Sequence, residues 1–289
     1  MALADRAKGW LQGQRPEAAP ARPAATVMIL RERGGAYGSG VEGSGTEGNG
    51  VEVFMLRRSS TMEFAPRMMV FPGGGVDQRD ADLSLPWAGP SPAELGRLLI
   101  ADEATARELV VAAVREVFEE CGVLLAGPDV DSVVGDVSGQ AWQAERESLL
   151  SHELSLAQML IGRGLVLRSD LLRVRAHWIT PEFEPKRYGT RIFAALLPSG
   201  QIADDKTSEA DHADWTDPAR LLEDYASGAA QMLPPTVVCI EQVAEVASIA
   251  EFLAAEVHME PITPVLTQAD GAVVMRCTLP WPGHLLAGE

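Results

Sequence analysis

Apolar residues recur along the chain in short runs, and the pattern predicts a protein that mixes strands and helices. Apolar runs bounded by charges or turns predict strands at residues 24–30, 51–56, 171–179, 190–197 and 210–215. Residues 104–125 instead repeat apolar side chains every three to four positions, which is the spacing of one helix face. We therefore expect a long helix there, ended by Gly122.

Further amphipathic stretches predict the remaining elements. Helices are expected at residues 91–100, 138–162, 217–227 and 236–257. The apolar stripe of 236–257 is interpreted as facing the core, with a homodimer contact as the alternative. Residues 262–280 predict a hairpin that turns at 268–271.

Segments that lack a periodic pattern of apolar residues indicate where the domain begins and ends. Residues 1–22 predict a disordered tail, and the glycine-rich stretch 34–50 predicts a flexible connection between two strands. We expect one domain at 23–260, followed by a C-terminal hairpin and tail at 261–289. Two insertions are expected within the domain, at about 76–103 and at 138–162.

The chain is strongly acidic, which limits its partners. It has 289 residues, with 41 Asp and Glu against 24 Lys and Arg, and a net charge of −17. Such a surface repels nucleic acid and anionic lipid, so neither is expected to bind. Three scattered cysteines suit neither a disulfide framework nor a zinc site. Residues 1–25 lack a secretory signal, so we expect a cytoplasmic protein.

The segment from Arg115 to Val123 carries the candidate chemistry. On a helix, Glu116, Glu119 and Glu120 lie at i, i+3 and i+4 and share one face. Their mutual repulsion destabilises a helix unless a cation offsets it, and Mg²⁺ prefers carboxylate oxygens and sites shared with phosphates. A solvated acidic face is the alternative. The ordered string Arg-Glu-apolar-x-Glu-Glu-x-Gly-apolar is, however, much rarer than scattered glutamates.

This string resembles the second half of the Nudix box, and Phe71-Pro72-Gly73-Gly74 resembles the strand and turn that open it. The box reads Gly-x5-Glu-x7-Arg-Glu-U-x-Glu-Glu-x-Gly-U, where U is apolar. The resemblance to the Nudix hydrolases implies an α/β fold, an α/β/α sandwich with a mixed β-sheet, here with helical and loop insertions. It also implies hydrolysis of a nucleoside diphosphate linked to another moiety, with Mg²⁺ or Mn²⁺ as cofactor.

The spacing inside the box is longer here than in the family. About 27 residues more than the box requires separate Gly74 from Arg115. Counting back from Arg115 places Arg107 where the box has its first glutamate. The resemblance implies that this glutamate mainly supports the other box residues. We therefore expect the metal site to form even with arginine at this position.

The resemblance also implies roles for single residues. Glu119 and Glu120 become metal ligands, and Glu116 becomes a ligand or the base that activates a metal-bound water. Arg115 orients a glutamate. The backbone carbonyl of Gly73 is expected to complete the metal shell.

Other site candidates lie outside the box. Family members often add a late acidic residue, for which Glu209 is the first candidate and Asp211 the second. Basic side chains flank the expected site, and four are taken to bind substrate phosphates: Arg58, Arg67, Arg187 and Arg191.

Three segments narrow the resemblance: residues 56–59, 71–74 and 177–191. They are similar to a branch that includes a mammalian peroxisomal coenzyme A diphosphatase. We therefore expect hydrolysis of a small-molecule diphosphate, in coenzyme A or an acyl derivative. ADP-ribose or another nucleoside diphosphate derivative is the alternative substrate. A catalytically silent Nudix-fold binding or regulatory module is the alternative from another class.

Overall fold

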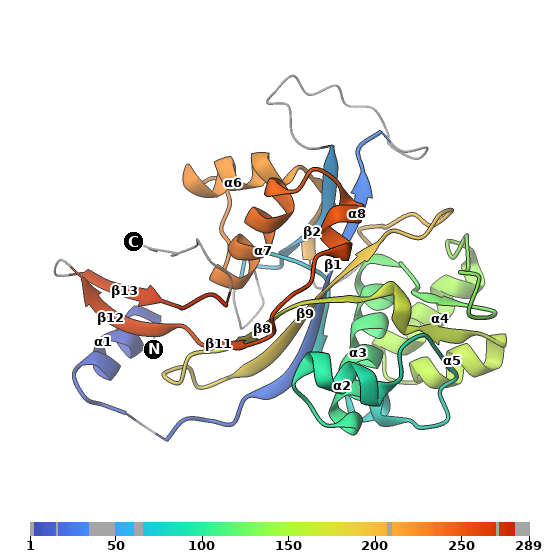
Figure 1. Cartoon of the computed structure of the whole chain (residues 1–289), viewed down its shortest axis with the longest axis horizontal. Helices are drawn as coiled ribbons and strands as arrows, with labels where there is room; N and C mark the ends of the chain where they lie inside the picture. The colour runs from blue at the N-terminus through green and yellow to red at the C-terminus, as the bar shows by residue number, and fades with distance from the viewer. Residues whose placement is uncertain are drawn as a thin grey trace.

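The computed structural model describes residues 3–15, 17–34, 50–60, 66–206, 210–269 and 272–280. The predicted α/β/α sandwich with a mixed sheet is confirmed: helices cover both faces of one large sheet (Figure 1). The helices are α1 (Leu3–Leu11), α2 (Pro92–Leu99), α3 (Glu103–Cys121), α4 (Gln140–Leu150), α5 (Leu156–Arg163), α6 (Pro218–Ala226), α7 (Pro234–Glu245) and α8 (Ile249–Ala254), with 3₁₀ turns η1 (Gln78–Ala81) and η2 (Ser169–Leu171).

The large sheet has eight strands, ordered β10-β2-β1-β9-β8-β11, with β3 paired to β2 and β4 paired to β1. Most neighbours are antiparallel, but β1 runs parallel to β9 and β11 runs parallel to β8. These strands are β1 (Arg22–Glu32), β2 (Val51–Arg58), β3 (Met69–Val70), β4 (Gly73–Gly75), β8 (Arg173–Ile179), β9 (Tyr188–Leu196), β10 (Ala210–Thr216) and β11 (Pro261–Ile262). A small three-stranded sheet holds β5 (Trp87–Ala88), β6 (Ala126–Gly127) and β7 (Val166–Arg168).

The central sheet separates two apolar cores. On one face, β1 and β2 pack against α2, α3, α4 and α5; on the other they pack against α6, α7 and α8 (Figure 1). Asp102 caps the start of helix α3, where its side chain accepts a hydrogen bond from the Thr105 amide at 2.9 Å. Gly122 caps the end of the helix, and its backbone is in the left-handed conformation. Val110, Val114 and Val117 on α3 are fully buried in the core that α3 shares with β1 and β2.

Both predicted insertions contain the expected helices: α2 lies within 91–100, α4 lies within 138–162, and α5 ends one residue beyond that range. The predicted hairpin is confirmed by β12 (Val265–Ala269) and β13 (Ala272–Arg276), although its turn falls partly outside the described residues. Most of the glycine-rich connection, residues 35–49, also lies outside them.

The prediction of one helix over 236–257 is wrong. Helix α7 ends at Glu245, Val246 is extended, and the Ser248 side chain starts α8 by accepting from the Glu251 amide. The apolar side chains of this segment are buried against the molecule's own sheet. That burial removes the sequence argument for a homodimer contact.

The N-terminal segment differs from the expected tail because it contains α1. Arg6 forms an ion pair of 2.8 Å with Glu184, and Trp10 packs against Phe183 with ring centroids 6.5 Å apart. Helix α1 lies beside the C-terminal hairpin (Figure 1). None of the helices in the described ranges has the length and apolar character needed to cross a membrane.

Candidate active site

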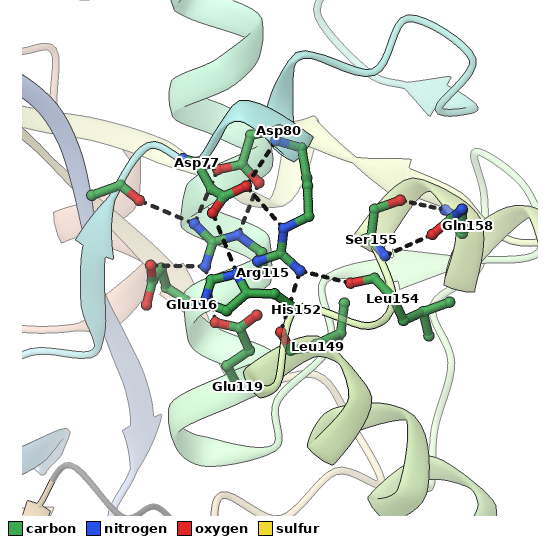
Figure 2. A network of polar contacts seen from close by, with 12 residues as sticks. Asp77, Asp80, Arg115, Glu116, Glu119, Leu149, His152, Leu154, Ser155 and Gln158 are labelled. Carbon is green, nitrogen blue, oxygen red and sulfur yellow. Dashed lines mark hydrogen bonds and ion pairs between the residues drawn. The ribbon is translucent and has the colours of Figure 1, made fainter.

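The guanidinium of Arg115 is the centre of a buried polar network at the sheet-facing side of α3. It donates to the two carboxylate oxygens of Asp80 at 2.8 and 3.0 Å and to the carbonyl of Gly75 at 3.0 Å. It also donates to Glu116 at 2.8 Å and to Glu119 at 2.9 Å. Figure 2 shows Arg115 among these acidic side chains. One arginine thus holds η1, β4 and α3 together.

Asp80, rather than Arg107, stands in the place of the first box glutamate. Counting forward from Gly74 by the box spacing reaches Asp80, and its carboxylate pairs with the box arginine. Arg107 instead donates to the carbonyls of Asp82 and Leu85 at 3.0 and 3.2 Å. The expectation for Arg107 is therefore wrong, because the extra residues lie after Asp80 and not before the box glutamate.

The network holds more negative than positive charge. Asp80, Glu116 and Glu119 all contact Arg115, and Glu120 is buried one residue further along α3. Burial lowers the pKa of Arg115, but its hydrogen bonds to Asp80 and the charges of Glu116 and Glu119 outweigh burial and raise it. Burial raises the pKa of Glu119, although the Arg115 charge opposes that shift.

The oxygen atoms of these side chains suit a hard divalent cation. Oxygen Oε1 of Glu119 is buried and has no hydrogen-bond partner among the described residues. An unpartnered buried carboxylate oxygen is costly, and a divalent cation would offset that cost. The carboxylates are nevertheless turned toward Arg115 and β4. Within the described ranges, no three His, Cys, Asp or Glu side chains are grouped to hold a metal ion.

The glycines of β4 allow α3 to approach the sheet closely. The Gly73 amide donates to Oε2 of Glu120 at 2.7 Å. A Cβ atom on Gly74 would lie 2.4 Å from Oε1 of Glu116, and one on Gly73 would lie 2.4 Å from the Ala25 carbonyl. Any larger residue at either position would displace the glutamates or the strand. The expected role of the Gly73 carbonyl as a metal ligand stays a prediction.

A pocket of about 480 Å³ opens beside this network. Glu116, Arg58 and Gly73–Gly75 line it, so one predicted ligand or base and one predicted phosphate-binding residue reach the same space. Apart from the carboxylate of Glu184, the rest of the lining is apolar or carries neutral polar groups. These residues are Ala24, Ala25, Thr26, Val70, Phe71, Trp178, Ile179, Thr180, Pro181, Phe183, Tyr188, Thr190, Ile192, Leu233, Pro234, Pro235, Thr236, Pro264 and Met275.

The other three predicted phosphate-binding arginines do not line this pocket. Arg67 is exposed and lies in a turn, where its amide donates to the Arg58 carbonyl at 3.1 Å. Arg187 donates to the carbonyls of Thr180 and Ala19 at 2.9 and 2.8 Å. Arg191 is buried and donates to the Leu99 carbonyl at the end of α2. Arg187 and Arg191 therefore hold backbone segments in place.

Of the late acidic candidates, Glu209 lies outside the described residues. Asp211 is exposed on β10, and its side chain accepts from the Ser60 amide at 3.2 Å. Strand β10 pairs with β2, which ends at Arg58. The segment around Asp211 therefore runs along the strand that supplies Arg58 to the pocket.

Two arginines that the sequence did not single out tie the helical insertion to this site. Arg146 on α4 is buried and donates to the Glu119 carbonyl at 2.9 Å and to Asp204 at 2.7 Å. Arg79 on η1 donates to the Leu154 carbonyl at 2.8 Å, in the loop between α4 and α5. No local pattern marks these contacts, because the Glu119 and Leu154 carbonyls lie far away in the sequence from Arg146 and Arg79.

Comparisons with known proteins find sequence relatives of this chain. No protein-family model matches the chain. The chain is 28% identical over 203 residues to the Caenorhabditis elegans protein named nudix hydrolase 7, an alignment that covers 67% of this chain and 56% of that protein. It is 24% identical over 265 residues to acyl-coenzyme A diphosphatase NUDT19 of Xenopus laevis, covering 77% of this chain and 69% of that protein.

A solved structure agrees with the fold. The NUDIX hydrolase from Alicyclobacillus acidocaldarius superposes with a TM-score of 0.66 at 25% identity, covering 82% of this chain and 97% of that one. The shared fold, the two curated relatives and the Asp80–Arg115 network on the helix of Glu116, Glu119 and Glu120 lead to one assignment. In sequence and in fold, the chain is similar to the Nudix hydrolases.

Proposed function

We propose that this protein hydrolyses a diphosphate linkage in a nucleoside diphosphate derivative, with Mg²⁺ or Mn²⁺ as cofactor. The observation that carries the proposal is the position of Glu116, which lines the pocket together with Gly73–Gly75 while Glu119 and Glu120 lie buried on the same helix. An acidic helix face beside a pocket suits a cation shared with substrate phosphates. The alternative of a solvated acidic face fits poorly with this burial.

Coenzyme A or an acyl derivative is the substrate we favour. The pocket combines the polar end at Glu116 and Arg58 with an apolar lining that includes Trp178, Phe183 and Met275. The Xenopus relative is named an acyl-coenzyme A diphosphatase. A substrate with a diphosphate and a long, less polar arm matches both ends of such a pocket.

In this proposal, separate residues hold the cation, orient the glutamates, bind phosphate and act as the base. Glu116, Glu119 and Glu120 would hold the cation, which when bound neutralises phosphate charge and lowers the pKa of a coordinated water. Arg115, fixed by Asp80, keeps Glu119 oriented, and the Gly73 amide restrains Glu120. Arg58 donates to a phosphate oxygen. Glu116 lines the pocket and is the candidate base, with Glu209 as a second acidic candidate.

The test is a panel of coenzyme A, ADP-ribose, NADH and nucleotide sugars, assayed for phosphomonoester release with Mg²⁺ or Mn²⁺. We expect turnover of coenzyme A that Glu120→Gln reduces at least about 100-fold, since the variant loses a ligand and a buried charge. Glu103→Gln, at the exposed start of the same helix, is the matched control and should retain activity.

Metal binding is measured separately from turnover. A cation that binds only the folded state raises Tm, so Mg²⁺ should stabilise the wild type more than Glu120→Gln. A folded wild type that is inactive across the panel with both metals would favour a binding or regulatory module. Full activity in the presence of a chelator would contradict the metal-dependent mechanism.

A further inference from the structure

Thr26 is the one polar residue in the apolar run of β1 at residues 24–30. Its neighbours Ala25 and Val27 are buried, whereas Thr26 is half-buried and lines the pocket beside the glutamates. Strand β1 pairs with β4 here, and Thr26 lies directly opposite Gly73. A hydroxyl group is therefore placed where the glycine strand meets the central sheet.

The hydroxyl group of Thr26 holds one particular peptide carbonyl. Its Oγ1 donates to the carbonyl of Pro72 at 2.7 Å and lies 3.2 Å from the carbonyl of Phe71. The backbone amide of Val27 donates to the same Pro72 carbonyl at 2.9 Å. The Pro72 carbonyl thus accepts two hydrogen bonds from β1, one for each of its lone pairs.

The other half of this peptide group binds Glu120. The Pro72 carbonyl and the Gly73 amide belong to one planar unit, so the direction of the carbonyl fixes the direction of the N–H. The Gly73 N–H donates to Oε2 of Glu120 at 2.7 Å. Glu120 is 5% exposed, so hydrogen bonds inside the protein orient its carboxylate. Hydrogen bonds to the carbonyl also polarise the peptide group and strengthen donation by its N–H.

Packing alone does not account for threonine at this position. A Cβ atom on Gly73 would lie 2.5 Å from Cα of Thr26 and 2.6 Å from its Cβ, so the two backbones are in direct contact. Valine has nearly the same shape as threonine and would fill this space equally well. The hydroxyl is what the Pro72 carbonyl requires, and it is the group that distinguishes threonine from valine.

We infer that Thr26 is a positioning residue, which acts through the peptide group between Pro72 and Gly73 to fix the carboxylate of Glu120. The inference rests on the proposed function, which makes Glu120 a cation ligand. Loss of the hydroxyl leaves the Pro72 carbonyl with one hydrogen bond fewer and loosens the Gly73 N–H that restrains Glu120. Cation binding then weakens, while the other residues that line the pocket keep their places.

Two substitutions at this position test the inference. Thr26→Val removes the hydroxyl and keeps the shape of the side chain, and Thr26→Ser keeps the hydroxyl. In the metal-free protein, Thr26→Val should speed hydrogen exchange of the Gly73 amide about 3- to 10-fold, the effect of losing one neutral hydrogen bond. NMR measures this exchange. The dissociation constant of Mn²⁺, measured by calorimetric titration, should rise by a similar factor. Thr26→Ser should stay near the wild type in both measurements.

Thr190→Val is the matched control. Thr190 lines the same pocket from β9, whose paired neighbours are β1 and β8. The same substitution there should change neither the exchange of the Gly73 amide nor the dissociation constant of Mn²⁺. In assays with coenzyme A, Thr26→Val should raise the metal concentration needed for half-maximal activity and leave KM at saturating metal unchanged. Circular dichroism and Tm confirm that each variant is folded.

Unchanged exchange of the Gly73 amide in Thr26→Val, or unchanged Mn²⁺ affinity despite faster exchange, would overturn the inference and leave diphosphate hydrolysis standing. A serine variant as impaired as the valine variant would also overturn it, because the hydroxyl would then not be the cause. If the wild type binds Mn²⁺ but hydrolyses no compound of the panel, the proposed function fails, while the two binding measurements still decide the role of Thr26. A wild type that binds no Mn²⁺ would overturn both.

Discussion

At the scale of single residues, the ion pair of Asp80 with Arg115 decides the shape of the site. Asp80 is 1% exposed and Arg115 is 4% exposed, so both charges are removed from water. Their two hydrogen bonds are charge-assisted and bidentate, which fixes the plane of the guanidinium. That plane in turn fixes where Arg115 meets Glu116 and Glu119.

We predict that Asp80→Asn lowers the free energy of unfolding by about 3 kcal/mol, since it leaves the Arg115 charge buried with one partner fewer. Urea denaturation measures this change, and diphosphatase activity should fall with it because Glu119 loses its oriented partner. Asp131→Asn is the control, because Asp131 is exposed and its substitution should cost less than about 0.5 kcal/mol. Equal stability of the two variants would contradict the role given to Asp80.

At the scale of elements, the helical insertion supports the end of α3 that carries the glutamates. Arg146 reaches from α4 to the carbonyl of Glu119, one of the last carbonyls of α3 that have no helical partner. It also binds Asp204, whose own amide donates to the Cys121 carbonyl at 3.0 Å. The insertion therefore stabilises the C-terminal turn of α3 from outside the helix.

Arg146→Met should lower the free energy of unfolding by about 2 to 3 kcal/mol, because it keeps the buried stem and removes hydrogen bonds made by a charged group. It should also raise the Mg²⁺ concentration needed for half-maximal activity, since Glu119 and Glu120 lie in the turn that loosens. Arg97→Met, on the exposed side of α2, is the control for losing an arginine. An unchanged metal requirement would show that Arg146 only stabilises the fold.

Much of this arrangement could be predicted from sequence, because its signals are local. The apolar spacing of Val110, Val114 and Val117 predicted α3, and the three box glutamates lie on that helix. The roles of Arg146 and Arg191 could not be predicted, since each binds backbone carbonyls that folding brings close. Asp80 lies at the box spacing from Gly74 but not from Arg115, because the extra residues separate it from the helix.

At the scale of the whole molecule, folding buries the imidazole of His177 in the large sheet. His177 is 5% exposed on β8, and its ring nitrogens have no hydrogen-bond partner within the described part of the chain. Burial, with a smaller contribution from the Arg191 charge, lowers the pKa of His177 from 6.5 to about 4. The folded protein therefore keeps this ring neutral where the unfolded chain would protonate it.

The lowered pKa predicts an acid-sensitive stability. Below pH 6.5 the unfolded chain gains a proton that the folded state takes up only near pH 4, so the free energy of unfolding falls as pH decreases across that window. The largest contribution of His177 is about 3 kcal/mol. Chemical denaturation at pH 7.5 and pH 4.5 should show a smaller difference for His177→Phe than for wild type. The exposed His212 provides the control substitution, His212→Phe, and an identical difference in all three proteins would contradict this account.

The Asp80–Arg115 pair has a consequence for recognising related proteins. Asp80 is positioned by its 3₁₀ turn and Arg115 by its helix. The segment between them can therefore differ widely in length without changing the ion pair. The loop-closure entropy of a longer insertion costs only about 0.6 kcal/mol for each doubling of its length. A search that demands a fixed gap and a glutamate will pass over such chains. A search that accepts aspartate and a variable gap before the arginine should retrieve them.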